Sequence, residues 1–249
     1  MKKLIIKNSY GEKLAGILHE SKSENIVLVC PGRVCTKEEY FYPELCESLA
    51  SNGFNSFRFD FSGNGESGGK FEECTISKDI LDIKSVVDYF KSKGYEIFCL
   101  IGHSLGAVEV LLYQSKYNSA RRVVDIAAYA DQRDATIKKF SEKQIEELNE
   151  KGFIKANSWG KKFNVYKKYF YDRANYWDIR KQVKKIKTPI LVVHGTEDKD
   201  VPLENSEKIA FALNKKSKFV PIIGAEHFYA NPKHRQRLFK EINSWLKLQ

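Results

Sequence analysis

The chain has 249 residues, enough for one large domain or two small ones, and its 42% hydrophobic and 30% charged residues exclude a disordered or fibrous protein. The formal net charge of +10 is unevenly distributed, because residues 133–187 hold 16 Lys or Arg against 7 Asp or Glu while the remainder is close to neutral. This concentration excludes an evenly basic, histone-like surface.

Short apolar runs alternate with longer helical periods along the chain. The runs predict strands at 3–6, 13–18, 25–30, 54–60, 96–101, 122–127, 189–194 and 218–223. Several runs, such as Ile-Leu-Val-Val at 190–193, are apolar throughout, which is typical of parallel strands covered on both faces. The first two runs alternate more regularly and predict an antiparallel hairpin at one edge of the sheet.

Apolar residues at helical spacing predict helices over 37–52, 77–93, 104–116, 205–213 and 232–248. The alternation of strands and helices predicts an α/β protein with a mostly parallel, doubly wound sheet of about eight strands. Residues 131–186 contain no convincing strand and carry helical periods and the aromatic residues Trp159, Tyr169, Tyr171, Tyr176 and Trp177. We therefore expect a helical lid here, inserted into a core formed by residues 1–130 and 187–249.

The cysteine and histidine content bears on metals and on location. Five cysteines form no CxxC pair, and with only five histidines they predict no metal site. Their odd number fits a reducing compartment, and the N-terminal run Leu4-Ile5-Ile6 is too short for a signal peptide. No stretch approaches the ~20 apolar residues of a membrane span. We expect a cytoplasmic protein.

The strongest motif is Gly102-His103-Ser104-Leu105-Gly106, which follows the strand at 96–101 and opens the next helix. In this position G-x-S-x-G is typical of a nucleophile elbow, a sharp turn that needs small residues two before and two after the serine. The turn exposes the serine hydroxyl at a helix N-terminus, which favours developing negative charge. Ser104 is therefore the predicted nucleophile.

A serine nucleophile needs a general base, which on this fold is a histidine late in the chain. Downstream of Ser104 the candidates are His194, His227 and His234. His227 lies in the loop after the last strand, where active-site groups gather in open α/β sheets. We therefore predict His227 as the base, whereas His234 lies on the final helix.

The base in turn needs an orienting acid, expected in the loop after the strand at 189–194. Asp198 is the best candidate, and Glu197 and Asp200 are its neighbours. The tetrahedral intermediate also needs an oxyanion hole. We predict the backbone N–H groups of Leu105 and Arg33 as its donors, since a glycine before Arg33 lets the loop turn inward.

These motifs resemble the α/β-hydrolase superfamily, and within it the small serine esterases and lipases of the monoacylglycerol-lipase and cinnamoyl (feruloyl) esterase type. The resemblance covers nearly the whole chain: residues 58–67 resemble a structural D-x-x-G-x-G-x-S loop, 194–202 the acid loop and 224–227 the histidine loop. It implies an α/β-hydrolase fold and favours Asp198 as the acid. The chain departs from the family in having Pro31-Gly32 for the usual His-Gly and Leu105 where a polar residue is frequent.

The leading hypothesis is a serine hydrolase that cleaves small acyl or aryl esters through an acyl-enzyme, without cofactor or metal. Thioesterase, amidase or peptidase activity with the same triad is the alternative, whereas a haloalkane dehalogenase would need Asp at the elbow. A non-catalytic protein of the same fold is a second class. Nucleic-acid binding through the basic segment is a third, and no nucleic-acid motif accompanies it. The basic lid instead favours an anionic substrate, with a merely solvated lid as the simpler interpretation, and no oligomeric state is predicted.

Overall fold

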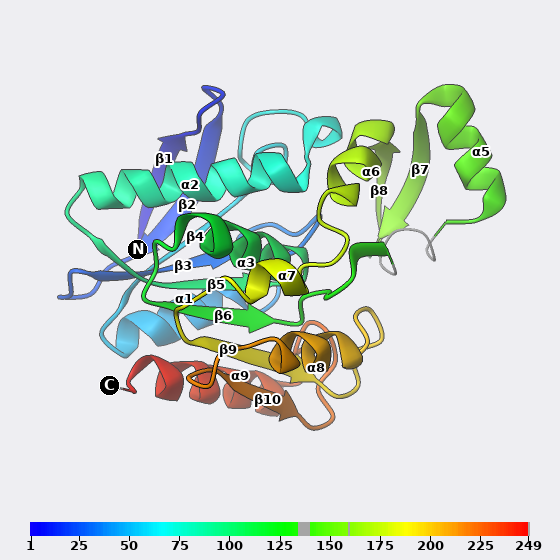
Figure 1. Ribbon diagram of the computed structural model, residues 1–249. Coiled ribbons are helices and arrows are strands. Elements are labelled where there is room, and N and C mark those ends of the chain that lie inside the picture. Colours follow the sequence, from blue (N-terminus) through cyan, green and yellow to red (C-terminus); the bar gives the residue numbers. More distant parts are fainter. Residues whose placement is uncertain (134–139, 159, 249) are drawn as a thin grey trace.

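The computed structural model describes residues 1–133, 140–158 and 160–248 (Figure 1). Its main sheet has eight strands in the order β1-β2-β4-β3-β5-β6-β9-β10. They are β1 (Lys2–Lys7), β2 (Lys13–His19), β3 (Asn25–Cys30), β4 (Asn55–Phe59), β5 (Glu96–His103), β6 (Arg122–Ile126), β9 (Ile190–Gly195) and β10 (Lys218–Ile222). All eight predicted strands are confirmed, with ends within two residues of the predicted ones.

The sheet is parallel from β4 to β10 and antiparallel only at one edge, where β2 pairs with both β1 and β4. The predicted edge hairpin is therefore β1–β2. Along β3, Ile26 and Leu28 pack into one apolar cluster, and Val27 and Val29 pack into another on the opposite face. A strand buried on both faces must be apolar at every position, which explains the unbroken apolar runs.

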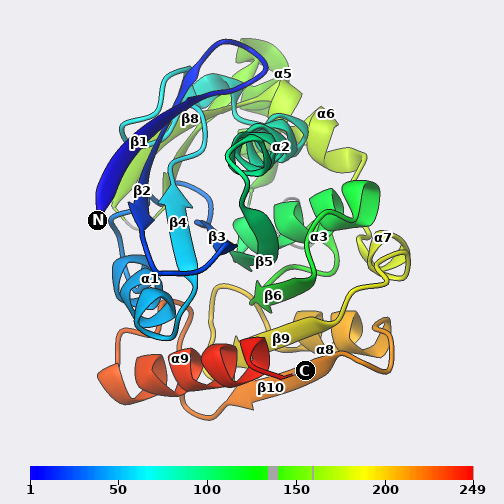
Figure 2. The same cartoon turned by 90° about the vertical axis from the view of Figure 1, so that its left-hand side faces the viewer.

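Helices cover both faces of the sheet (Figure 2). On one face lie α1 (Tyr42–Ser51) and α9 (Pro232–Leu246), and on the other lie α2 (Ile76–Ser92), α3 (Leu105–Tyr117), α7 (Arg180–Val183) and α8 (Glu204–Phe211). The helix predicted at 37–52 begins five residues later, at Tyr42, with Pro43 in its first turn, where a proline is tolerated. None of the described helices is long and apolar enough to cross a membrane.

Residues 131–186, which join β6 to β9, are called the β6–β9 segment below. Its described part contains α5 (Glu142–Lys151), β7 (Phe153–Ser158), β8 (Lys161–Tyr166), α6 (Lys167–Ala174) and the short helix α7, which packs on the main sheet. The expectation of a segment without strands is wrong, because β7 and β8 pair as an antiparallel hairpin beside the main sheet (Figure 1). Residues 134–139 and Trp159, both within the predicted lid, lie outside the described residues.

The hairpin was missed because apolar residues in and after it are also spaced as on an α-helix. Phe163, Tyr166 and Phe170 are spaced as on a helix, yet Phe163 lies in β8 and Phe170 in α6. The strand period is carried by Ile154 and Val165, which are opposite each other in the hairpin and 1% and 2% exposed. With so few apolar positions in each strand, alternation is a weak signal.

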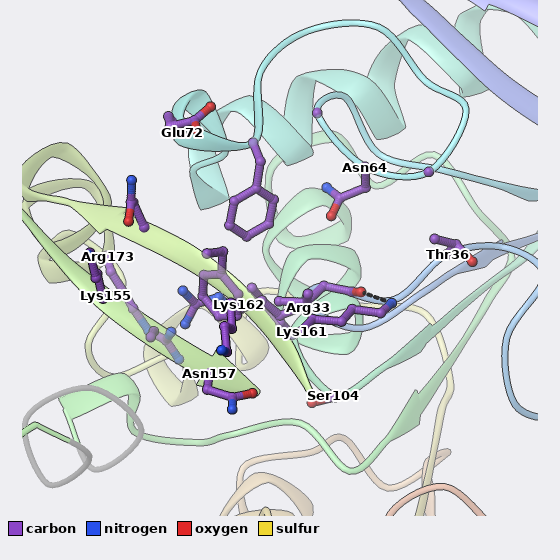
Figure 3. A pocket seen from close by; sticks show the side chains of 18 of the residues that line it. Arg33, Thr36, Asn64, Glu72, Ser104, Lys155, Asn157, Lys161, Lys162 and Arg173 are labelled. Atoms are coloured by element: carbon purple, nitrogen blue, oxygen red, sulfur yellow. Dashed lines mark hydrogen bonds between the residues drawn. The ribbon is translucent and has the colours of Figure 1, made fainter. Parts of the chain in front are cut away.

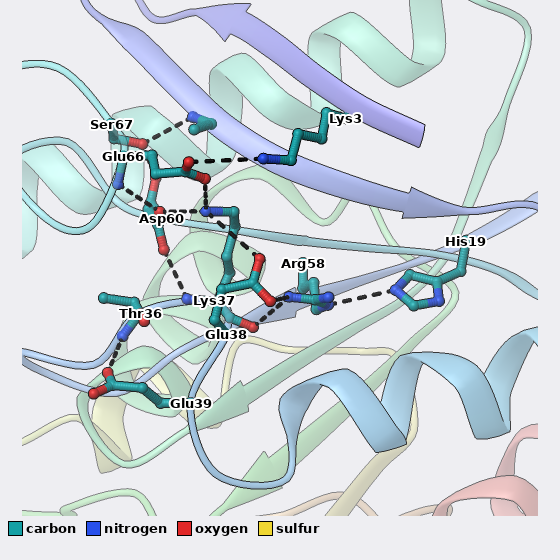
Figure 4. Close-up of polar contacts among 11 residues, drawn as sticks. Lys3, His19, Thr36, Lys37, Glu38, Glu39, Arg58, Asp60, Glu66 and Ser67 are labelled. Atoms are coloured by element: carbon teal, nitrogen blue, oxygen red, sulfur yellow. Dashed lines mark hydrogen bonds and ion pairs between the residues drawn. The ribbon is translucent and has the colours of Figure 1, made fainter. Parts of the chain in front are cut away.

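A buried ion pair fixes the loop at residues 58–67 beneath the sheet edge (Figure 4). The Lys37 ammonium lies 2.9 Å from Asp60 Oδ2 and 2.6 Å from Glu66 Oε2, and the Lys37 and Asp60 side chains are 2% and 0% exposed. Asp60 also accepts hydrogen bonds from the backbone N–H groups of Lys37 and Glu66. A Cβ on Gly65 would lie 2.2 Å from Asp60 Oδ2, so only glycine fits there. These contacts support the structural role expected of this loop.

We predict that Lys37→Met lowers the free energy of unfolding by about 3–5 kcal/mol, because it leaves the buried Asp60 carboxylate without its cation. The matched control is Lys84→Met, which removes the same charge from an exposed pair with Asp88 and should cost less than about 1 kcal/mol. Urea denaturation measures both. Equal losses in the two variants would contradict the proposed importance of the buried pair.

Candidate active site

Ser104 lies at the turn between β5 and α3 in a backbone conformation that side-chain-bearing residues rarely adopt, with φ 56° and ψ −120°. The turn brings backbone segments into close contact. A Cβ on Gly102 would lie 2.4 Å from Ala107 Cα, and a Cβ on Gly106 would lie 2.2 Å from the Pro31 carbonyl oxygen. The predicted need for small residues on either side of the serine is thus confirmed, because a side chain at either glycine would overlap backbone atoms.

The loop that follows β3 lies against the serine. A Cβ on Gly32 would lie 3.2 Å from the Ser104 Cβ, so the loop passes within contact distance of the nucleophile position. Among the described residues, the backbone N–H of Arg33 has no hydrogen-bond acceptor. Leu105 is the first residue of α3, so its N–H has no acceptor within the helix. The two N–H groups predicted for the oxyanion hole therefore belong to segments that both adjoin Ser104.

His227 and Asp198, which are far apart in sequence, are hydrogen-bonded to each other. His227 Nδ1 lies 2.6 Å from Asp198 Oδ2, and the two side chains are 2% and 1% exposed. Burial alone would raise the pKa of the Asp198 carboxyl, but hydrogen bonds from His194 and His227 hold that pKa well below its usual range. Asp198 is therefore a carboxylate over the whole physiological pH range, and His227 presents its Nε2 on the opposite side of the ring.

His194, the other strand-end histidine, has a different place. Its Nε2 lies 3.1 Å from Asp198 Oδ2 and 2.9 Å from the Val201 carbonyl oxygen, so Nε2 carries the proton and donates to these acceptors. Its Nδ1 lies 2.6 Å from the Ser206 hydroxyl. Both ring nitrogens of this fully buried histidine are engaged in holding the acid loop. From the sequence, His194 was one of three candidate bases and part of the acid-loop motif, and its role as a support for Asp198 was missed.

The neighbouring carboxylates do not take the place of Asp198. Glu197 is exposed, and the Asp200 N–H donates to Asp198 Oδ1, as does the Val201 N–H. Asp198, Asp200 and His227 each offer a ligand atom within 4.8 Å of the others, the spacing of a possible metal site. However, both oxygens of Asp198 are already occupied by four hydrogen bonds, which is the arrangement of an acid that orients a histidine.

A buried chain of hydrogen bonds joins the loops around Ser104, and the sequence reasoning missed it. The Gly32 N–H donates to the Tyr42 hydroxyl at 3.1 Å, and this hydroxyl lies 2.7 Å from His103 Nδ1. His103 Nε2 lies 3.0 Å from the His227 carbonyl oxygen, to which it donates. His103 was visible as the variable residue of the elbow motif, whereas nothing in the sequence distinguished Tyr42.

An open cleft of about 1360 Å³ separates the serine from the β6–β9 segment (Figure 3). Ser104, Leu105 and Tyr129 line it from the main sheet, and Arg33 and Asn64 line it from neighbouring loops. The β6–β9 segment contributes mostly polar and basic side chains, namely Gln144, Lys155, Asn157, Lys161, Lys162, Asn164 and Arg173. Any molecule that reaches Ser104 through this cleft therefore passes a positively charged wall.

The sheet order, the elbow and the loops that meet at it define the α/β-hydrolase fold. Residues 41–249 match the prolyl oligopeptidase family, and the chain belongs to that family. Mitochondrial palmitoyl-protein thioesterase ABHD10 of Bos taurus is 30% identical over 172 residues, which are 67% of this chain and 54% of that protein. The chain thus spans about half the length of this curated relative.

Solved structures share the fold over almost the whole chain. Est1E from Butyrivibrio proteoclasticus, solved with ferulic acid bound, has a TM-score of 0.83 and 24% identity, with 98% of this chain and 97% of that one covered. α/β hydrolase domain-containing protein 10 from mouse has a TM-score of 0.83 and 21% identity, with 98% of both chains covered. These likenesses show the fold, and the family match places the chain in a hydrolase family.

We predict that His103 makes stability fall in mild acid. Burial first, and then the neighbouring His227, lower the pKa of His103 well below its ordinary value. The unfolded chain takes up this proton near pH 6.5 and the folded chain does not, so the stabilisation is complete above pH 6.5 and is lost as the pH falls. Relative to His103→Asn, wild type should lose up to about 1.4 kcal/mol of unfolding free energy per pH unit between pH 6.5 and 5. Urea denaturation curves that stay parallel in the two proteins across this range would contradict the prediction.

Proposed function

We propose that the chain is a serine hydrolase that cleaves carboxylic esters, with Ser104 as nucleophile, His227 as general base and Asp198 as the orienting acid. The observation that carries the proposal is the buried hydrogen bond of 2.6 Å between His227 and Asp198. The carbonyl oxygen of His227 also accepts a hydrogen bond from His103, the residue just before Ser104. The proposal is also supported by the strained turn that holds Ser104 at the floor of the cleft.

In the proposed reaction, Ser104 Oγ attacks the ester carbonyl carbon while His227 Nε2 takes the hydroxyl proton. Asp198 keeps the proton of the imidazole on Nδ1 and stabilises the imidazolium. The N–H groups of Arg33 and Leu105 donate to the oxyanion, and the N-terminal end of α3 favours its charge. The intermediate collapses to an acyl-enzyme as His227 gives its proton to the leaving alcohol. Water, deprotonated by His227, then releases the acid.

The β6–β9 segment is proposed as a lid over a core of residues 1–130 and 187–249. It forms the outer wall of the cleft, so its side chains select what reaches Ser104. The size of the cleft fits a small acyl or aryl ester. The reaction requires neither cofactor nor metal.

A cytoplasmic location is proposed because all five cysteines are free thiols, which suits a reducing compartment.

A thioesterase is the second candidate, because the curated relative is named a palmitoyl-protein thioesterase. Peptidase or amidase activity is a third, since the matched family takes its name from an oligopeptidase. The same three side chains serve all of these reactions. The candidates differ in the leaving group, so a matched substrate series separates them.

We predict that Ser104→Ala lowers turnover of p-nitrophenyl butyrate on the order of 10⁶-fold, because no other group supplies the nucleophile. Asp198→Asn should lower it on the order of 10⁴-fold through loss of the correct imidazole tautomer. Wild type should also react with a fluorophosphonate probe at Ser104, observed by peptide mass spectrometry. A Ser104→Ala protein that is folded and as active as wild type would disprove the triad.

The leaving-group preference follows from butyryl substrates that differ only in the scissile bond: a phenyl ester, a phenyl thioester and an anilide. An ester hydrolase should show higher kcat/KM for the ester than for the thioester, corrected for their spontaneous hydrolysis rates, and little anilide cleavage. A corrected preference for the thioester would favour thioesterase activity, and efficient anilide cleavage would favour an amidase or peptidase. Ser104→Ala is the control for each substrate.

A further inference from the structure

Two arginines share one aromatic ring at the wall of the cleft. The Arg33 guanidinium lies 4.3 Å from the ring centroid of Tyr169 in α6, and the Arg173 guanidinium lies 5.4 Å from the same centroid. Arg33 is also 5.2 Å from the ring of Phe163 in β8. These rings hold Arg33 in place and cover part of its surface, so its position does not depend on an ion pair.

Neither guanidinium has a carboxylate partner in the part of the chain that the structure describes. Among the described residues, no Asp or Glu oxygen lies within 4 Å of Arg33 or Arg173, and the Arg33 guanidinium makes no hydrogen bond. Arg173 is 4% exposed and donates only to the neutral Gln132 amide and Tyr169 hydroxyl. Its Nε is buried and has no acceptor within the described part of the chain.

Removing a cation from water without an anion beside it costs free energy. This desolvation lowers the pKa of Arg33. An anion with two oxygens would relieve this cost, because a carboxylate matches the fork of N–H donors on a guanidinium. Both arginines line the cleft that contains Ser104, and Figure 3 draws all three among the side chains around it. The side chains of Arg33 and Arg173 therefore border the space that a molecule bound at the serine would occupy.

The acidic residues nearby do not cancel this charge. Asp79 and Glu109 line a small recess of about 30 Å³ next to Arg33. Burial raises the pKa of both carboxyl groups, which favours their neutral form over the charged one. Glu72 at the cleft is exposed to solvent, while Lys155 and Lys162 add positive charge to the opposite wall.

We infer that Arg33 and Arg173 form a subsite for a carboxylate carried by the substrate, so that the preferred substrates are esters bearing a second, free carboxylate. This inference rests on the proposed ester hydrolysis at Ser104 and adds the substrate class. The role of the Arg33 side chain is distinct from that of its backbone N–H in the oxyanion hole. The selectivity is best measured as the ratio of kcat/KM for an anionic ester to kcat/KM for a neutral one. A variant that loses activity on both esters alike leaves this ratio unchanged.

The test compares mono-p-nitrophenyl adipate, which carries a free carboxylate, with its methyl ester, which is neutral and of nearly the same shape. Wild type should show a higher kcat/KM for the anionic ester, with the advantage shrinking as salt rises. Arg33→Met and Arg173→Met should each lower the ratio of anionic to neutral kcat/KM by about 10- to 100-fold, the range expected for a lost hydrogen bond to a charged group. Arg33→Lys should retain part of the preference.

The matched control is Lys168→Met, which removes one positive charge from an exposed position in the same helix as Tyr169, outside the cleft. Its ratio should stay within about twofold of wild type, because screening weakens exposed charges. The inference would be overturned if the arginine variants and Lys168→Met gave the same ratio of anionic to neutral kcat/KM. It would also be overturned if wild type preferred the neutral ester.

A binding measurement separates failure of the subsite from failure of the proposed function. Calorimetry on the Ser104→Ala protein with monomethyl adipate should give binding that is lost on adding Arg33→Met or Arg173→Met, whereas dimethyl adipate should bind weakly to all. If wild type hydrolyses neither ester but monomethyl adipate binds in this arginine-dependent way, the subsite stands and the proposed function fails. Hydrolysis of the neutral ester with no arginine-dependent binding overturns the subsite alone. Circular dichroism confirms that each variant is folded.

Discussion

The backbone contact between Gly106 and the Pro31 carbonyl is the constraint on which the site depends. Because α3 begins so close to the loop after β3, Ser104 is forced into its strained turn at the end of β5. The same contact places the Arg33 loop beside the serine and the first free N–H of the helix next to it. The nucleophile position and both expected oxyanion donors thus follow from one close packing of backbone on backbone, which no side chain can adjust.

Hydrogen bonds then connect this turn to the histidine loop. His103 accepts from Tyr42, which accepts from the loop at Gly32, and His103 donates to the carbonyl of His227. On the far side His194 and His227 share one oxygen of Asp198. A buried polar network of this kind is stable only when each member has its partner, so the loops are held in one arrangement before any substrate arrives.

The sequence predicted the sheet well because buried parallel strands must be apolar at every position, and their runs at 26–30, 98–101 and 190–193 stand out from the polar helices and loops. It also predicted that Asp198 and His227 would meet, because both follow strands whose carboxyl ends lie at one edge of the sheet. The hairpin β7–β8 was missed because Ile154 and Val165 are the only buried positions among the strand residues whose burial the structure describes. Tyr42 acts through a contact with His103, 61 residues along the chain, which local pattern does not encode. The partners of His194 lie within 12 residues of it, but the fold of the loop after β9 decides that they meet.

Within the β6–β9 segment, Ile154, Val165 and Tyr169 form a small apolar cluster that is separate from the two clusters of the main sheet. The end of the segment instead packs into one of the main-sheet clusters, through Ile179, Val183 and Ile186. Polar contacts also join the segment to the rest of the molecule, such as the Lys161 ammonium on Glu39 and the Asp172 carboxylate on the Ser77 N–H. Substitutions at Ile154 should be more nearly additive with those in the sheet than substitutions at Val183, which packs into the sheet's own cluster. In evolutionary terms, the wall that meets the substrate is free to diverge in charge and shape, while selection for folding acts mainly on the sheet beneath it.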